Sequence, residues 1–147
     1  MIALDTNLLV YAYLSEVAEH QAARRAIQSA CQNPAGWGVA SSTVSEFWCV
    51  TTHPRCSGGP APPAQARQFL FNLIEEGGGN VWQPGADFGQ RLLQLAEELE
   101  VTGPRIFDLQ IALIAFENGA TELWSHDRNF VGIPGLRVLD PLETPAI

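Results

Sequence analysis

The sequence predicts an α/β fold in which helices cover both faces of a short, mostly parallel sheet of about four or five strands. Short apolar segments alternate along the chain with longer segments of helical periodicity. Strands and helices that alternate in this way form right-handed crossovers, which place helices on both faces of the sheet. The composition, with 46% hydrophobic and 16% charged residues, is that of a globular protein.

The first part of the chain is expected to contain one strand and two helices. Residues 2–4 form a short apolar strand, and Asp5-Thr6-Asn7 begins a helix that continues through residues 8–14, since polar residues of this kind cap helix N-termini. Ser15 precedes a second helix, which extends to about residue 30, because its apolar residues recur at helical spacing. A turn at residues 33–36 ends this part.

A second strand and two more helices surround a long loop. Residues 37–40 form the strand, and a helix begins at residues 41–43 and reaches about residue 53. Residues 54–63 are rich in proline and glycine, so they form an irregular loop. The next helix covers residues 64–76 and ends at three glycines.

The remaining elements are two helices and three strands. Residues 81–82 form a brief strand, and residues 86–101 form an amphipathic helix that ends at a Thr-Gly-Pro break. The most hydrophobic helix covers residues 106–118, with Gly119 in a C-cap position. The last two strands are expected at residues 122–125 and 137–139.

Length and composition restrict the class of protein. We expect a single domain over residues 1–147, because 147 residues can bury one continuous core. The N-terminus lacks the basic segment of a signal peptide, and no apolar run is long enough to span a bilayer. The three cysteines lack the spacing of a metal site and are expected to be reduced. We therefore expect a cytoplasmic protein without membrane contact.

The net charge is −8 at pH 7. This acidity argues against a protein that binds nucleic acids without specificity, since such proteins cluster Lys and Arg. It does not exclude a nuclease, because a bound metal lowers the local negative charge and the eight basic residues, all arginines, can be unevenly placed. The acidity also suits a complex with a basic partner.

Four carboxylates follow apolar strands or strand–helix junctions, and they belong to Asp5, Glu46, Asp108 and Asp127. In α/β sheets, functional groups collect just beyond the carboxyl ends of the strands. Acids gathered there repel one another, and the chain has no lysine to offset their charge. A hard divalent ion such as Mg²⁺ is the natural candidate, since carboxylates are its preferred ligands and the Cys/His clusters typical of zinc sites are missing. A metal held by carboxylates indicates phosphate chemistry.

Each carboxylate also has a purely structural interpretation. Asp5 and Asp108 can cap helices, and Asp127 can form an Asx turn. Glu46 lies opposite the apolar side of its helix and fits a capping box with Thr43. The helix around Asp108 is apolar almost all round, so an unpaired carboxylate buried there would be costly. One shared site explains the four positions more simply than several unrelated caps at the mouth of one sheet.

Polar neighbours extend the candidate site. Thr6, Asn7 and Ser125 stand at strand ends, where they can orient a ligand or a bound water, and Asn129 offers an outer contact. Three arginines flank the predicted crevice, either as phosphate contacts or as ordinary solvated residues, namely Arg55, Arg105 and Arg128.

Four motifs in this order resemble those of PIN-domain ribonucleases, and the chain length resembles that of the VapC-type toxins of bacterial and archaeal toxin–antitoxin pairs. The motifs are Asp5-Thr6-Asn7, Ser45-Glu46-Phe47-Trp48, Ile106-Phe107-Asp108-Leu109-Gln110-Ile111-Ala112 and Ser125-His126-Asp127-Arg128-Asn129-Phe130. The resemblance covers about residues 2–140.

This resemblance implies a three-layer α/β/α fold and Mg²⁺- or Mn²⁺-dependent cleavage of RNA, usually by a homodimer that a cognate antitoxin holds inactive. By motif, Asp5 and Asp108 would be the leading metal ligands, and Asp127 and Glu46 would complete the acidic cluster directly or through water. Asn129 stands where many relatives carry a further acid, so the number of metal ions is left open. The alternative is a PIN-like module that binds RNA or protein without cutting it.

Overall fold

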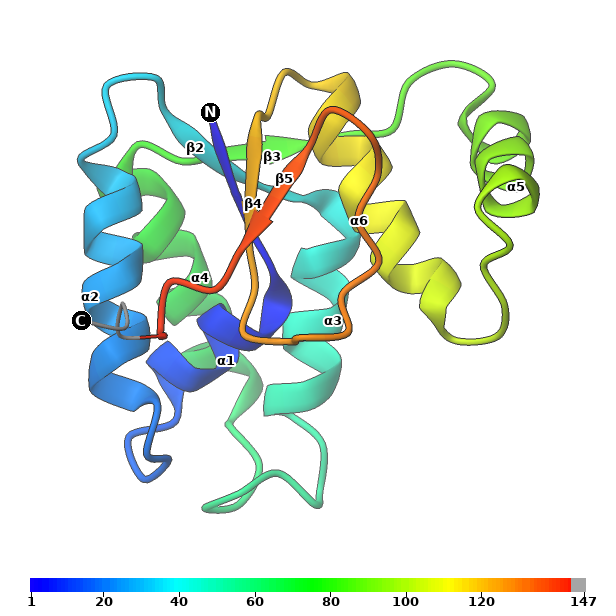
Figure 1. Cartoon of the computed structure of the whole chain (residues 1–147). Coiled ribbons are helices and arrows are strands. Elements are labelled where there is room, and N and C mark those ends of the chain that lie inside the picture. Colours follow the sequence, from blue (N-terminus) through cyan, green and yellow to red (C-terminus); the bar gives the residue numbers. More distant parts are fainter. Residues whose placement is uncertain (144–147) are drawn as a thin grey trace.

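The computed structural model describes residues 1–143 and contains a five-stranded sheet (Figure 1). The strands are β1 (Ile2–Leu4), β2 (Trp37–Ala40), β3 (Asn80–Trp82), β4 (Glu122–Trp124) and β5 (Arg137–Leu139). They lie in the order β3-β2-β1-β4-β5, and each pair of neighbours is parallel. β1 is therefore the central strand, between β2 and β4.

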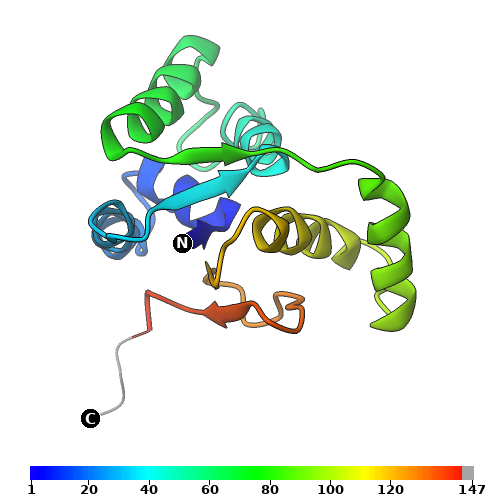
Figure 2. The same ribbon diagram turned by 90° about the horizontal axis from the view of Figure 1, so that it is seen from above.

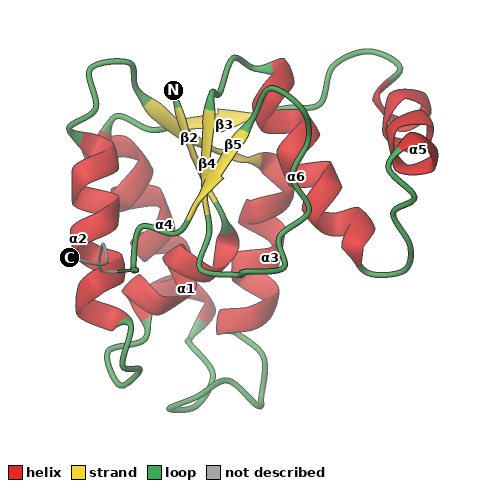
Figure 3. Cartoon of the chain, viewed as in Figure 1, coloured by secondary structure: helices red, strands yellow, loops and turns green. Residues whose placement is uncertain are grey.

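Helices cover both faces of this sheet, as Figures 2 and 3 show. They are α1 (Thr6–Tyr13), α2 (His20–Cys31), α3 (Ser41–Thr51), α4 (Pro63–Gly77), α5 (Phe88–Glu98) and α6 (Arg105–Glu117). The core on one face is built with α1 to α4, and the core on the other face with α5 and α6. This arrangement confirms the predicted α/β fold. None of the described helices is both long and apolar enough to cross a bilayer.

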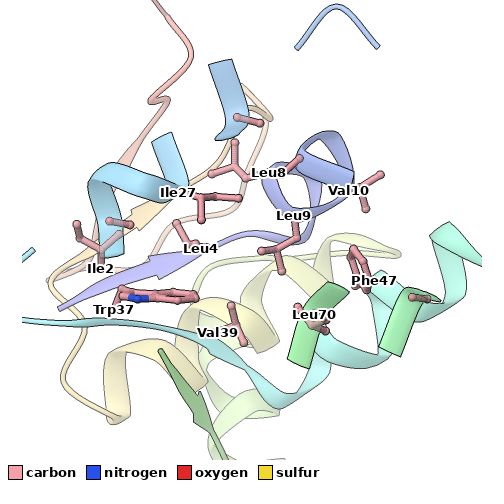
Figure 4. Packing of buried hydrophobic residues seen from close by; sticks show 14 of the residues in the cluster. Ile2, Leu4, Leu8, Leu9, Val10, Ile27, Trp37, Val39, Phe47 and Leu70 are labelled. Atoms are coloured by element: carbon pink, nitrogen blue, oxygen red, sulfur yellow. The ribbon is translucent and has the colours of Figure 1, made fainter. Parts of the chain in front are cut away.

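Side chains of β1 alternate between the two cores, because successive residues of a strand point to opposite faces. Ile2 and Leu4 pack with Leu8 and Ile27 of the α1–α2 side (Figure 4). Ala3 belongs to the core on the α6 side. β1 is thus buried on both faces, as in the interior of parallel sheets generally. Its carboxyl end fixes the position of the next residue, Asp5.

α2 begins later than the sequence pattern predicts. The helix starts at His20 rather than directly after Ser15, and the segment between α1 and α2 forms turns. Leu14 has an extended conformation that ends α1. Nδ1 of His20 lies 2.9 Å from the carbonyl oxygen of Tyr11, and this contact fixes the start of α2 against α1.

α5 and α6 also differ from expectation. α5 covers Phe88–Glu98 rather than residues 86–101, because Asp87 and Glu100 have φ angles of 57° and 53°, outside the range of a right-handed helix. The expectation that α6, as an almost entirely apolar helix, is buried is confirmed for Leu109 and for residues 111–115 but not for its two phenylalanines. Phe107 and Phe116 of this helix are 61% and 43% exposed, so one side of α6 faces solvent.

Candidate active site

Asp5 occupies the junction between β1 and α1. It is the N-cap residue of α1, and its Oδ1 accepts a hydrogen bond from the Thr6 amide at 2.7 Å. Its Oδ2 accepts a hydrogen bond from Oγ of Ser125 at 2.6 Å. The residue is 7% exposed. The capping interpretation is therefore correct for Oδ1, while Oδ2 faces a residue 120 positions away in the sequence.

Ser125 connects the ends of β1 and β4, which are neighbours because Leu4 pairs with Trp124. Besides donating to Asp5, its hydroxyl oxygen accepts hydrogen bonds from Nδ2 of Asn7 at 3.2 Å and from the backbone amide of Asp127 at 3.0 Å. Ser125 is 2% exposed. One buried hydroxyl thus joins two carboxylate residues and an amide side chain.

Glu46 joins the same network through Thr6. Oγ1 of Thr6 donates to Oε2 of Glu46 at 2.9 Å. The expected capping box is wrong, because α3 already begins at Ser41, with Ala40 as its N-cap residue. Glu46 consequently lies in the second turn of α3, and its carboxylate contacts the first residue of α1.

Asp127 lies in the segment after β4. Its Oδ1 accepts a hydrogen bond from the backbone amide of Asn129 at 2.8 Å, which is an Asx turn. The structural interpretation of this carboxylate is therefore correct. The amide of Asp127 bonds at the same time to Ser125, so the turn is fixed beside Asp5.

Asp108 lies in the first turn of α6, where Pro104 rather than Asp108 is the N-cap residue. Burial raises the pKa of the Asp108 carboxyl. The negative charges of Asp127 and Glu46 act in the same direction, whereas the Val131 amide and the Arg105 guanidinium act against it. Asp108 therefore lies within the field of two other carboxylates.

The pKa of Asp5 shows the same mutual influence. Burial raises it from 3.8 to about 6. The hydrogen bonds from Ser125 and from the Thr6 amide lower it, and the negative charges of Glu46 and Asp108 raise it further. Four carboxylates from four separate segments of the chain thus influence one another at the carboxyl edge of the sheet; we call them the carboxylate cluster, and they are Asp5, Glu46, Asp108 and Asp127.

The donor set of the carboxylate cluster fits a hard divalent cation, because its members offer only oxygen atoms. Crowded carboxylates with raised pKa values also gain from a positive charge placed between them. Within residues 1–143, no three Asp, Glu, His or Cys side chains are already grouped closely enough to hold one ion. A metal would therefore have to draw the cluster together.

The three arginines differ in their relation to the carboxylate cluster. Nη1 of Arg105 lies 4.0 Å from Oδ2 of Asp108 and also donates to the carbonyl oxygen of Asn129. Arg128 pairs with Glu143 at 2.9 Å and is 83% exposed. Arg55 is exposed in the loop after α3, and the described contacts do not connect it with the cluster. Arg105 is thus the arginine that the structure brings to the site.

A histidine–carboxylate pair beside the site was not predicted from the sequence. Nδ1 of His126 lies 2.8 Å from Oδ2 of Asp140, and the backbone amide of His126 donates to Oδ1 of Asn7 at 3.4 Å. The ring of Tyr11 meets the His126 ring edge-on at 6.0 Å between centroids. Asp140 directly follows β5, so the rule that selects acids after strands would have found it.

The chain matches the family described as PIN domain over residues 2–136. Ribonuclease VapC43 of Mycobacterium tuberculosis (strain H37Rv) is 31% identical over 143 residues, which are 97% of this chain and 97% of that protein. Ribonuclease VapC33 of the same organism is 25% identical over 143 residues, 97% of this chain and 99% of that protein.

Solved structures with the same fold include one described as a toxin and two that are bound to DNA fragments. VapC20 of M. tuberculosis, described as a sarcin–ricin loop cleaving toxin, has a TM-score of 0.67 at 15% identity over 88% of this chain and 92% of its own. VapBC2 of Rickettsia felis, bound to a DNA fragment from the promoter, has a TM-score of 0.68 at 20% identity, over 95% and 98%. FitAB bound to an IR36 DNA fragment has a TM-score of 0.70 at 14% identity, over 99% of both chains. At these identities the likeness concerns the fold alone.

Proposed function

The chain belongs to the PIN domain family, with VapC ribonucleases among its relatives, and from this premise we propose that it is a toxin-type endoribonuclease that hydrolyses RNA phosphodiester bonds with Mg²⁺ or Mn²⁺. One observation carries the proposal. Four carboxylates from separate segments lie at one edge of the sheet. Two buried residues, Thr6 and Ser125, link Asp5 to Glu46 and to the backbone amide of Asp127. Asp108 is related to this group through the negative charges of Asp127 and Glu46, which raise the pKa of its carboxyl.

The four carboxylates would bind the ion in different ways. Asp5 and Asp108 are the leading ligands, and Asp127 and Glu46 complete the site directly or through water. A bound divalent ion supplies an activated water and offsets charge on the phosphoryl oxygens. Ser125 and the Thr6 amide hold the Asp5 carboxylate in one orientation. Arg105, beside Asp108, is placed to bind a phosphate of the substrate.

We also propose the partners of this activity. A cognate antitoxin would hold the enzyme inactive, and the net charge of −8 suits an antitoxin segment that is basic. The active form would be a homodimer that works in the cytoplasm, where its RNA substrate is found. Gel filtration with light scattering tests the dimer, and a small basic open reading frame directly upstream would support the antitoxin.

Cleavage of a mixed RNA pool tests the activity. We expect the purified protein to cut the pool with Mg²⁺ or Mn²⁺ and to leave it intact with EDTA. The Asp108→Asn variant should lose at least about a hundredfold in rate, because a charged ligand is replaced by a neutral one that binds the metal weakly. Asp87→Asn is the matched control, since it removes one exposed carboxylate at the start of α5. An active Asp108→Asn variant would contradict the assigned role.

A second candidate function is a PIN-like module that binds RNA or protein without cutting it. The observation in its favour is that no three potential ligands of the described chain are grouped for one ion. The same pool separates the two functions. Binding of the RNA by the wild-type protein, with no cleavage at any metal concentration up to several millimolar, would favour the binding module.

A further inference from the structure

We infer that a cavity beside the carboxylate cluster receives one base of the RNA and that Phe107 and Gln110 determine which base it takes; this inference rests on the proposed function. The cavity lies between α3 and α6 and has a volume of about 640 Å³. Small-molecule pockets have volumes of about 300–1,000 Å³, so a nucleobase fits here.

The cavity and the carboxylate cluster share a boundary. Glu46 lines the cavity and also accepts the hydrogen bond from Thr6 at 2.9 Å. Phe107 lines the cavity and directly precedes Asp108 on α6. An RNA strand whose scissile phosphate lies at the carboxylates therefore has a neighbouring nucleotide beside the cavity.

The lining favours an uncharged, flat group over a phosphate. Glu46 is its one charged member, and none of the residues lining this cavity is a lysine or arginine. A phosphate would be repelled there, whereas Pro84, Ile111 and Ile114 present apolar surface to a base. The backbone of the RNA would instead follow the metal and Arg105 outside the cavity.

Phe107 gives the cavity an aromatic surface that is open to solvent, with 61% of the residue exposed. Bases stack on exposed aromatic rings, which is the common means of holding single-stranded RNA. Ser42 also lines the cavity, and its Oγ is buried and has no hydrogen-bond partner among the described residues. The amide of Gln110 and the hydroxyl of Ser45 add donors and acceptors for the edge of a base.

A randomised pool of single-stranded RNA tests the base preference. The full-length wild-type protein cuts the pool with Mn²⁺, and sequencing of the fragment ends gives the base frequencies around the cut. We expect one position next to the cut to show a preference, which Phe107→Ala weakens and Gln110→Ala alters. On one RNA chosen from the pool, Phe107→Ala should raise KM roughly tenfold with kcat almost unchanged, since a lost stacking contact weakens binding of substrate and transition state alike.

Phe116→Ala is the matched control, because Phe116 is an exposed phenylalanine of the same helix that lies outside the cavity. Phe116→Ala should leave both the base preference and KM as in the wild type. Phe107→Trp, which keeps an aromatic ring, should also show the wild-type preference and KM that Phe107→Ala loses. Equal base frequencies and KM values for Phe107→Ala and wild type would overturn the inference.

An abasic substrate gives a second readout. The chosen RNA is prepared without the base at the preferred position. We expect the wild-type KM for this RNA to rise at least to the value of Phe107→Ala. The KM of Phe107→Ala should rise by a smaller factor, because only the contacts of Gln110 and Ser45 with the base remain to be lost. If the missing base affects both proteins by the same factor, the base does not contact Phe107 and the inference is overturned.

Binding separates this inference from the proposed function. If the wild-type protein cuts no RNA, the proposed function fails, and anisotropy of a fluorescein-labelled random hexamer then tests the base site. Weaker binding by Phe107→Ala than by Phe116→Ala supports the site, and equal binding overturns it. A change in oligomeric mass in Phe107→Ala would also overturn it, since the cavity would then be an interface between two copies of the chain.

Discussion

The carboxyl group of Asp5 serves local structure and the candidate site at once. One oxygen caps α1 and the other accepts the Ser125 hydroxyl, so both oxygens are oriented by the fold. Burial raises its pKa to about 6, so the folded protein binds a proton here more tightly than the unfolded chain does. The ionised form that a metal requires is therefore the form that the metal-free fold disfavours.

This conflict predicts a pH dependence of stability in the metal-free protein. The unfolded pKa of 3.8 lies below the folded value of about 6, so the free energy of unfolding falls as the pH rises between these two values. The loss at neutral pH is about 3 kcal/mol, because a tenfold difference in proton affinity between the folded and unfolded states corresponds to about 1.4 kcal/mol. Asp5→Asn removes this effect, and urea unfolding with EDTA from about pH 4 to 7 measures it. If the free energies of unfolding of the wild type and of Asp5→Asn change with pH in the same way, the pKa of Asp5 is not raised by folding.

At the scale of single residues, the sequence predicted positions better than contacts. Asp5 and Asp127 were expected at strand ends, and their cap and turn are present, but the hydroxyl between them belongs to Ser125, which the sequence places only as a neighbour. The predicted capping box of Glu46 is wrong because the prediction placed the start of α3 too late in the sequence. The catalytic roles of these carboxylates stay predictions until cleavage is measured.

At the scale of elements, all five strands lie where the apolar segments were found. Strands in a parallel sheet are buried on both faces, so their apolar runs are visible in sequence. Helix ends were less predictable. The start of α2 depends on a contact between α1 and α2, and the ends of α5 depend on positive φ angles at Asp87 and Glu100. Such features follow from packing rather than from local residue preference.

Substitution by alanine should have opposite effects on the free energy of unfolding at two glycines, Gly38 and Gly89. A Cβ on Gly38 of β2 would lie 2.7 Å from the backbone oxygen of Asn80 and 2.7 Å from the Trp82 ring, so Gly38→Ala should lower the free energy of unfolding by roughly 1–3 kcal/mol or more. A Cβ on Gly89 of α5 would meet no atom within 4 Å, so Gly89→Ala should raise it by up to about 1 kcal/mol. Thermal and urea unfolding measure the stability of both variants. If Gly38→Ala is as stable as the wild type, β2 and β3 can move apart without loss of stability.

At the scale of the whole molecule, the parallel sheet brings the ends of its strands to one edge, and this rule predicted a shared site that includes Asp5 and Asp127. The rule does not apply to Asp108, which lies on α6 and follows α5 rather than a strand. The sequence could not show that the Arg105 side chain lies beside Asp108 whereas that of Arg128 pairs with Glu143. It also could not show the cavity between α3 and α6, since a cavity depends on how two helices pack.

Metal binding should stabilise the entire fold. An ion that binds only the folded state adds about 2.7 kcal/mol at one hundred times its Kd. For a domain of this size that corresponds to a rise in Tm of about 5–10 °C. We expect this rise with Mg²⁺ or Mn²⁺ in the wild type and in Asp87→Asn, and almost none in Asp108→Asn. Differential scanning calorimetry measures it, and an unchanged wild-type Tm at millimolar metal would count against the metal site.

The central place of β1 in the sheet has a consequence for biosynthesis. β1 is made first by the ribosome, yet it pairs with β4, and Asp5 bonds to a residue 120 positions later in the chain. The site therefore cannot assemble until translation has passed residue 127. A nascent chain that has not reached residue 127 therefore lacks the residues that hold Asp5 in place.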